Sequence, residues 1–105
     1  MQFVETPVFT RQARELLADE DLRALQLALW YRPEQGAVIP GGGGLRKIRW
    51  ARKGKGKRGG IRVIYFLHAE EDRVYLLLCY PKSMQDDLSR EQLRILARLV
   101  REELK

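Results

Sequence analysis

The chain has 105 residues, of which 45% are hydrophobic and 32% are charged. This size and composition are typical of one globular domain, residues 1–105, and exclude a disordered or low-complexity chain. The single cysteine, Cys79, excludes an intrachain disulfide. No apolar run is long enough to span a membrane, and the N-terminus lacks the pattern of a signal peptide. We therefore expect a cytoplasmic domain with no membrane partner.

The positive charge is concentrated in one part of the chain. Twenty Lys and Arg residues against fourteen Asp and Glu residues give a formal net charge of +6. Residues 45–62, which we call the basic segment, hold nine of the basic residues and no acid, so the rest of the chain carries a net charge of −3. Such a segment favours a polyanionic partner, and we expect it to contact nucleic acid.

The apolar periodicity predicts an α+β domain with the element order β-α-α-β-β-β-α. The expected elements are a strand at residues 2–6, helices at 10–18 and 19–31, a loop at 34–44, strands at 45–51, 60–69 and 73–80, and a helix that follows residue 89. Thr10 and Asp19 are expected to cap the first two helices, and Ser89 with Gln92 forms a capping box for the third. The three later strands suit an antiparallel meander. The last of them, VYLLLCY, is apolar on both faces and should lie in the centre of the sheet.

The strands place several cations where they could act together. Alternation puts Lys47 and Arg49 on one face of their strand. Arg62 interrupts an apolar run, where an arginine either pairs with a carboxylate or faces a phosphate, and we favour the phosphate. Lys82 follows the last strand, and nearby positive charge could lower its pKa and make it a base. The other basic residues expected to hold RNA are Arg46, Arg52, Lys53, Lys55, Lys57 and Arg58.

Other chemistries fit the sequence less well. Residues 54–59 match G-x-G-x-x-G, but a strand rather than a helix follows them, which argues against a dinucleotide site. His68 is the only histidine and is expected to be a structural or surface residue, and no metal or other cofactor is expected. Asp86 and Asp87 precede the last helix, where we expect them to be solvated and to interact with the helix dipole.

Two sequence blocks carry a family resemblance. They are GLRKIRWARKGKGKRGGIRVIYF, residues 44–66, and YPKSMQDDLSREQLRILARLV, residues 80–100. In this order and spacing they resemble the RelE/HigB superfamily of toxins from type II toxin–antitoxin systems, and in particular its HigB-like branch. The resemblance extends from about Phe3 to Lys105.

The resemblance implies a compact RelE-like domain with two N-terminal helices packed on a small, mainly antiparallel sheet. It implies a toxin that cuts mRNA on the ribosome, without a metal, and thereby inhibits translation and growth. It also implies a cognate antitoxin, often a helix-turn-helix protein, through which alone the toxin would reach operator DNA.

Carried over residue by residue, the family's basic pair falls on Lys47 and Arg49, and its strand arginine falls on Arg62. The basic residue after the last strand falls on Lys82. Many relatives have a tyrosine or histidine near the next positions, but residues 83–88 contain neither. The terminal helix is also longer than in some relatives, which could move the surface that binds the antitoxin.

Three functions therefore remain open at the level of sequence. The first is a ribosome-dependent mRNA endonuclease in which Arg62, Lys82, Arg49 and Lys47 form the catalytic site. The second is a toxin of the same fold that acts on DNA gyrase, as in the ParE branch. The third is a non-catalytic module in which the basic segment only binds RNA or DNA.

Overall fold

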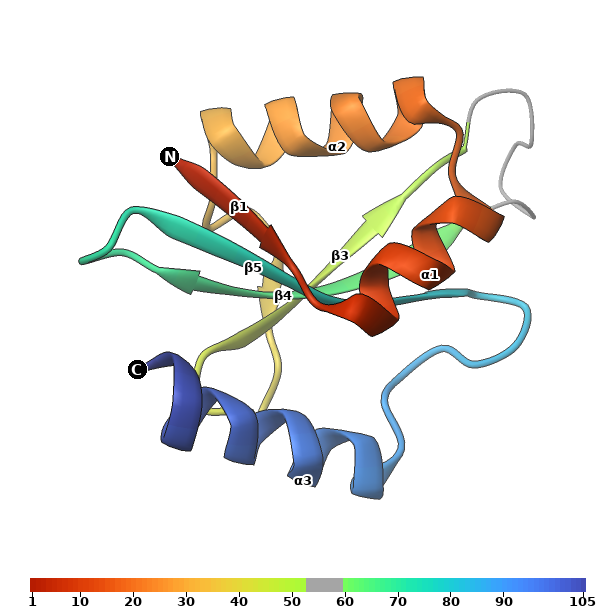
Figure 1. Cartoon of the computed structure of the whole chain (residues 1–105). Coiled ribbons are helices and arrows are strands. Elements are labelled where there is room, and N and C mark those ends of the chain that lie inside the picture. Colours follow the sequence, from red (N-terminus) through yellow and green to blue (C-terminus); the bar gives the residue numbers. More distant parts are fainter. Residues whose placement is uncertain (53–59) are drawn as a thin grey trace.

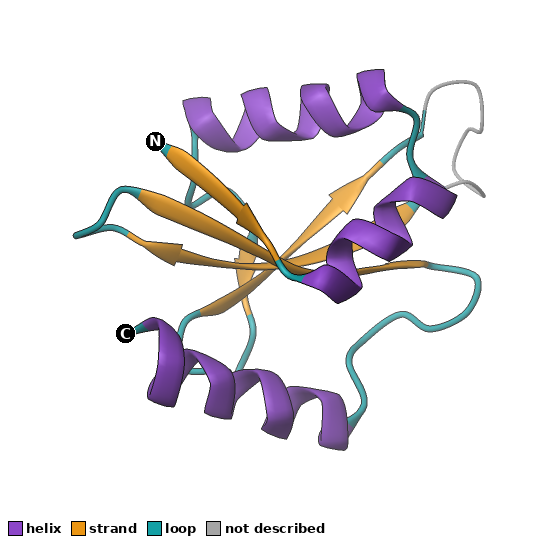
Figure 2. Cartoon of the chain, viewed as in Figure 1, coloured by secondary structure: helices purple, strands orange, loops and turns teal. Residues whose placement is uncertain are grey.

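The computed structural model describes residues 1–52 and 60–105, and these form three layers (Figure 1). In chain order the elements are β1 Gln2–Glu5, α1 Pro7–Leu16, α2 Asp19–Tyr31, β2 Ala37–Val38, β3 Leu45–Trp50, β4 Ile61–His68, β5 Arg73–Pro81 and α3 Arg90–Leu99, after which Val100–Leu104 form a π-helical turn. Helices α1 and α2 lie on one face of the sheet and α3 lies on the other (Figure 2). The α+β class is confirmed, with one additional strand.

The sheet has the strand order β1-β5-β4-β3-β2. Strand β1 runs parallel to β5, and the other neighbours are antiparallel, so the predicted meander of β3, β4 and β5 is confirmed. Strand β5 lies inside the sheet between β1 and β4, as its apolar character on both faces favours. The central strand is β4, however, so the expected position of β5 was wrong by one strand. Strand β2 lies in the segment that was predicted to be a loop. It has only two residues, which is too short to show a periodicity.

The first helix begins earlier than predicted, because Thr6 rather than Thr10 caps it. The Thr6 Oγ1 accepts the N–H of Phe9 at 3.0 Å, and Pro7 occupies the first turn, where its missing N–H costs nothing. The Thr10 hydroxyl instead donates to Glu5 Oε1 at 2.7 Å. The expectation for Thr10 was therefore wrong.

The other two caps differ in how well the sequence revealed them. Asp19 is the first residue of α2 and not its cap, which is Ala18, so that expectation was wrong by one residue. The capping box of α3 is confirmed: Ser89 Oγ accepts the Gln92 N–H at 3.1 Å, and Gln92 Oε1 accepts the Ser89 N–H at 2.9 Å.

Two apolar clusters fix the helices to the sheet. The cluster on the side of α1 and α2 contains buried side chains from both helices and from the sheet: Phe9, Ala13, Leu17, Leu25, Leu29, Ile48, Ile61, Val63, Tyr65, Val74, Leu76 and Cys79. The cluster on the α3 side contains Leu45, Ile64, Phe66, Leu77, Tyr80 and Val100. Burial raises the pKa of the Cys79 thiol to about 12, so this residue packs as a small apolar side chain. Among the described residues, none belongs to a helix long and apolar enough to cross a membrane.

Tyr65 anchors the connection between α2 and β2 from inside the core. Its hydroxyl donates to the Pro33 carbonyl at 2.7 Å and accepts the Gly36 N–H at 2.8 Å. Any Cβ at Gly36 would come within 2.7 Å of the tyrosine ring, so only glycine allows this approach. Desolvation by burial raises the pKa of Tyr65, which keeps the hydroxyl protonated and able to donate.

Replacing Tyr65 by phenylalanine should lower the free energy of unfolding by about 1–3 kcal/mol, because two backbone groups lose their partner. Urea unfolding measures the change, and the slope with denaturant should stay constant if only stability is affected. Tyr31 is 86% exposed and provides the matched control, since Tyr31→Phe should change stability by less than about 0.5 kcal/mol. Equal effects of the two substitutions would contradict an anchoring role for Tyr65.

Candidate functional site

Three polar side chains form a row across the neighbouring strands β3, β4 and β5, near the start of β4. In the strand register Arg49 of β3 lies opposite Arg62 of β4, and Arg62 lies opposite Tyr80 of β5. Residues opposite one another share a face, and Tyr80 belongs to the apolar cluster on the α3 side. Lys47 lies two residues before Arg49 and therefore on the same face. The structure thus brings Lys47, Arg49 and Arg62 to one face of the sheet, and their catalytic role stays a prediction.

The α3 face of the sheet is divided into an apolar part and a cationic part. Leucines of α3 and its final turn pack against Leu45, Ile64 and Phe66. Arg62 is the second residue of β4 and Phe66 is near its end, so the cationic row lies toward the opposite end of the strand from Phe66. There the connection between β5 and α3, residues 82–89, contacts the row. We call these residues the connecting segment.

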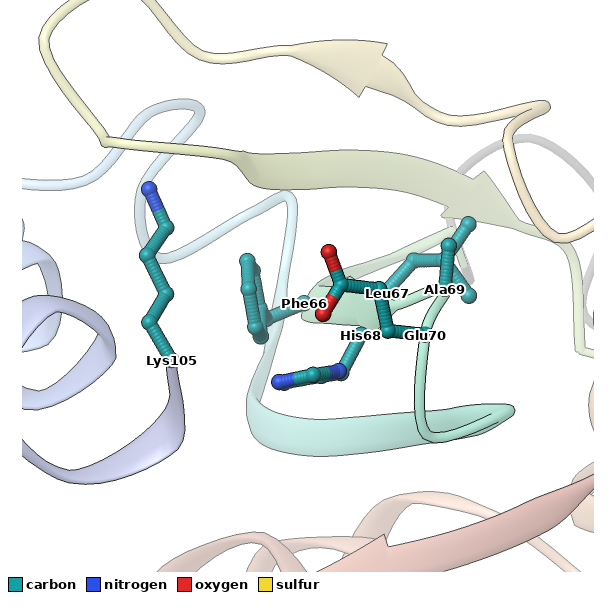
Figure 3. Close-up of a pocket in the computed structure, with 6 residues that line it drawn as sticks. All are labelled: Phe66, Leu67, His68, Ala69, Glu70 and Lys105. Atoms are coloured by element: carbon teal, nitrogen blue, oxygen red, sulfur yellow. The ribbon is translucent and has the colours of Figure 1, made fainter.

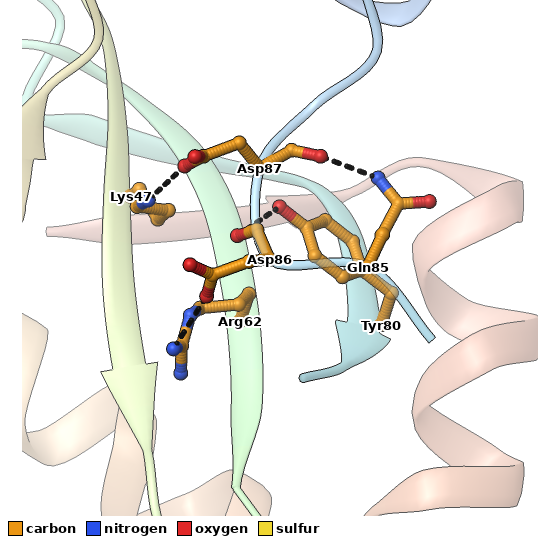
Figure 4. Close-up of polar contacts among 6 residues, drawn as sticks. All are labelled: Lys47, Arg62, Tyr80, Gln85, Asp86 and Asp87. Carbon is orange, nitrogen blue, oxygen red and sulfur yellow. Dashed lines mark hydrogen bonds and ion pairs between the residues drawn. The ribbon is translucent and has the colours of Figure 1, made fainter. Parts of the chain in front are cut away.

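Two carboxylates of the connecting segment bind the cations (Figure 4). Asp86 Oδ1 accepts a hydrogen bond from Arg62 Nη2 at 2.8 Å, and Asp87 Oδ1 accepts one from Lys47 Nζ. Both aspartates are exposed to solvent, as expected, but their ion pairs with the two cations were not predicted. Of the two alternatives left open for Arg62, a carboxylate partner is present in this structure, and the favoured role toward a phosphate stays a prediction.

Arg62 is the buried cation of this site. Its side chain is 4% exposed, and Nε is buried with no hydrogen-bond partner among the described residues. A buried donor without a partner costs free energy, and such groups in native proteins often have a functional reason. Among the described residues, the Nε of Arg62 is therefore a donor without a partner, while Nη2 of the same guanidinium binds Asp86.

The cations and the burial change the ionisation of their neighbours. The hydrogen bond from Arg62 lowers the pKa of Asp86, and the charges of Arg62, Lys47 and Lys82 act in the same direction. Desolvation by burial raises the pKa of Tyr80, with Asp87 contributing in the same sense. At neutral pH the site thus contains an ionised Asp86 and a neutral Tyr80 hydroxyl, which can donate a hydrogen bond but is a poor base.

A family model described as the RelE toxin of the RelE / RelB toxin-antitoxin system matches residues 1–104. The chain belongs to the RelE toxin family. A solved structure described as the intact E. coli RelBE toxin-antitoxin complex matches with a TM-score of 0.58 and 17% sequence identity, over 76% of this chain and 94% of that one. That likeness supports the fold, while the family model identifies the chain as the toxin of a toxin–antitoxin system. The assignment to the HigB-like branch stays a prediction.

The toxin presents two further predicted site residues to solvent. Arg49 is exposed beside the buried Arg62. Lys82 is also exposed, and its backbone N–H donates to the Gly60 carbonyl at 3.0 Å, which fixes the first residue of the connecting segment beside the start of β4. The charge of Lys82 helps to lower the pKa of Asp86. A role for Lys82 as a base stays a prediction.

Of the remaining predicted RNA-binding residues, the structure describes Arg46 and Arg52, which lie apart from the cationic row. Arg46 lies on the opposite face of β3 and donates through Nη1 to the carbonyls of Glu34 and Gly36, both at 2.8 Å, which gives it a structural role in the toxin. Arg52 Nη1 lies 3.5 Å from the carbonyl oxygen of Leu16, at the end of α1. The predictions for Lys53, Lys55, Lys57 and Arg58 lie outside the described residues.

The sequence reasoning missed three residues of this site in the toxin: Tyr80, Asp86 and Asp87. Tyr80 could have been found by pairing the two predicted strands, since a short turn at residues 70–72 brings the end of the third meander strand opposite the start of the second. No local signal could have revealed the carboxylates. Asp86 is 24 residues from Arg62 in the chain, and Asp87 is 40 residues from Lys47.

A hollow at the other end of the β4–β5 hairpin contains the only histidine of the toxin (Figure 3). His68 Nδ1 accepts the backbone N–H of Glu71 at 3.2 Å, and its ring stands edge-on to Phe66 with centroids 6.2 Å apart. Phe66, His68, Glu70 and Lys105 line this hollow, and none of them belongs to the cationic row. The structural role predicted for His68 agrees with these contacts.

Proposed function

We propose that this toxin is a ribosome-dependent mRNA endonuclease that inhibits translation and growth. The observation that carries the proposal is the row of Arg49, Arg62 and Tyr80, with Lys47 beside it, on one face of the sheet in a RelE-family toxin. The basic segment, which supplies three of these residues, fits the phosphate backbone of RNA.

The proposed reaction uses the 2′-hydroxyl of the RNA itself as the nucleophile. Its oxygen attacks the adjacent phosphorus, the bond from phosphorus to the 5′-oxygen breaks, and a 2′,3′-cyclic phosphate and a 5′-hydroxyl result. The phosphate gathers negative charge in the transition state, and a fixed cation stabilises that charge. Arg62 would do this, Lys47 and Arg49 would orient the RNA or help to deprotonate the hydroxyl, and Lys82 is a further candidate.

Dependence on the ribosome follows from what these residues provide. The site offers cations and a neutral Tyr80 hydroxyl, while His68 lies at the far end of the β4–β5 hairpin. A cationic site of this kind should be slow by itself. The ribosome would supply the geometry of the mRNA, and fixed geometry can contribute several kcal/mol to lowering a barrier, about 7–11 kcal/mol in the best cases.

The partner proposed for the toxin is a cognate antitoxin in the cytoplasm. The family model is named for a toxin–antitoxin pair, and the structural match comes from a RelBE complex. We propose a helix-turn-helix antitoxin that blocks the toxin and carries it to operator DNA. Co-purification of the toxin with the product of a neighbouring small gene, followed by operator binding with and without that product, tests both parts.

Primer extension on cellular mRNA after induction tests the cleavage. We expect growth arrest with discrete breaks within codons of translated messages, and no breaks in the same RNA when purified toxin acts without ribosomes. An SOS response with intact mRNA would instead identify gyrase as the target. Salt-sensitive binding without growth arrest would identify a non-catalytic module. Either of these outcomes contradicts the proposal.

A further inference from the structure

The cationic site of the toxin is closed by carboxylates of its own chain. Arg62 and Lys47 lie beneath, with side chains 4% and 19% exposed, while Asp86 and Asp87 lie outside them, 62% and 73% exposed. A strand of RNA approaching from solvent therefore meets two negative charges before it meets the two cations. Like charges facing one another oppose binding.

These carboxylates occupy the positions that an oxyanion ligand would take. Arginine and lysine bind carboxylate and phosphate oxygens with the same charge-assisted hydrogen bonds. Asp86 and Asp87 are consecutive residues, and they bind cations of two neighbouring strands, β4 and β3. Two adjacent phosphates of an RNA backbone present a similar pair of anions. Among the residues that the structure describes, the Nε of Arg62 has no hydrogen-bond partner, so it could donate to a second oxygen of the same phosphate.

We propose that Asp86 and Asp87 are built-in competitors of the RNA backbone, which hold Arg62 and Lys47 in the free toxin and leave them when two adjacent phosphates bind. This proposal deepens the function proposed above and rests on it. It assigns a regulatory task to the connecting segment: the site opens only for a ligand with enough negative charge to displace both carboxylates.

The contacts of the connecting segment allow such a movement. Met84 is 79% exposed, and Gln85 Nε2 donates to the Asp87 carbonyl at 3.0 Å at the surface and to Gln92 Oε1 at 2.9 Å in a partly buried contact. Leu88 packs against the apolar cluster on the α3 side and would stay in place as an anchor. Segments with few buried contacts open at low cost in free energy compared with the whole fold.

The test measures binding of the isolated toxin to a short 2′-O-methyl RNA, which has backbone phosphates but no nucleophilic hydroxyl. The double variant D86N/D87N keeps the shape of both side chains and removes their charge. We expect it to bind this RNA roughly three- to thirtyfold more tightly than the wild type, because each pair with an exposed carboxylate contributes modestly. Fluorescence anisotropy at low salt gives the affinities, and circular dichroism confirms that the variants are folded.

The variant E70Q/E71Q is the matched control. It removes the same charge from exposed residues in the turn at the opposite end of the β4–β5 hairpin, and we expect about a twofold change or less from the difference in net charge. If D86N/D87N binds no more tightly than this control, or more weakly, the carboxylates position the cations rather than compete with RNA, and the proposal is overturned.

Failure of this proposal can be distinguished from failure of the proposed function. The binding assay needs neither ribosomes nor cleavage. Suppose that D86N/D87N binds RNA more tightly but induction of the wild type causes no mRNA breaks. This result would support competition between the carboxylates and RNA and would contradict the endonuclease function. Breaks made by the wild type together with unchanged binding in D86N/D87N would do the reverse.

Discussion

Replacing Arg62 by alanine is expected to abolish growth arrest and to lower the rate of mRNA cleavage on ribosomes by about 10²–10³-fold. Removal of one fixed charge that stabilises a developing oxyanion typically costs this much, about 3–4 kcal/mol of barrier. Arg62 is 3% exposed and lies centrally in the row between Arg49 and Tyr80, so no solvent ion can replace it at low cost. A time course of primer extension on programmed ribosomes measures the rate.

Because Arg62 is buried, loss of activity must be separated from loss of the fold. Arg62→Lys keeps the charge and most of the volume but loses the fork of donors, so it should retain the fold and have intermediate activity. Arg94→Ala removes a cation from the exposed face of α3, where its pair with Glu91 is 3.7 Å long, and should cleave like the wild type. Thermal unfolding and antitoxin binding serve as controls. Full toxicity of Arg62→Ala at matched expression would overturn the assignment of the site.

The parts of the fold that the sequence predicted are those with local causes. The capping box of Ser89 and Gln92 needs only residues three apart, and the faces of Lys47 and Arg49 need only strand alternation. The three meander strands have the apolar runs that a sheet covered on both faces requires.

The errors at the first two helices came from competition between neighbouring candidates. Thr6 and Thr10 can both cap a helix, and a proline directly after Thr6 favours the earlier start. Asp19 is a good capping residue by type, but α2 begins at Asp19 itself, one residue earlier than a cap at Asp19 predicts, so Ala18 is the cap. The Ala18 N–H donates to Asp21 Oδ2 at 3.4 Å. Side-chain type alone does not choose between positions this close.

The candidate site was predicted as far as single strands allow. Alternation identified Lys47 and Arg49, and the charge out of pattern identified Arg62. The row itself depends on the register between strands, which brings Tyr80 opposite Arg62. The carboxylate partners depend on the path of the connecting segment after β5, and many paths are compatible with its sequence. The pairing of Asp86 with Arg62 and of Asp87 with Lys47 could therefore be found only from the structure.

The second large effect is expected from the part of the basic segment outside the described residues. The variant K53A/K55A/K57A/R58A removes four cations that we propose to bind the RNA backbone. For single-stranded RNA each phosphate contact contributes about 0.7 to the slope of log affinity against log salt, so the slope should fall by about 3. At about 0.15 M salt this corresponds to roughly a hundredfold weaker binding. A salt titration of RNA affinity measures both quantities.

The control for this variant removes four other cations, exposed ones on α1 and α3. These are Arg11, Arg14, Arg94 and Arg98. Both variants have the same net charge, so a general loss of attraction to RNA would weaken them equally. If the four cations of the basic segment bind phosphates and release counterions, their removal should lower the slope, while removal of the four control cations should not. Equal slopes would show that residues 53–58 do not bind RNA, and the basic segment would then act through its strands alone.

The two variants together distinguish residues that contribute to the rate of cleavage from residues that contribute to RNA affinity. Arg62→Ala should reduce cleavage by about 10²–10³-fold while removing one phosphate contact, so the salt slope of RNA binding should change by about 0.7. K53A/K55A/K57A/R58A should change the slope by about 3, and its cleavage should recover when the concentration of programmed ribosomes is raised to saturation. A toxin whose Arg62 variant loses affinity and not rate would use the whole basic segment for holding RNA. In that case the row on the sheet is a binding surface, and the endonuclease proposal fails at its central residue.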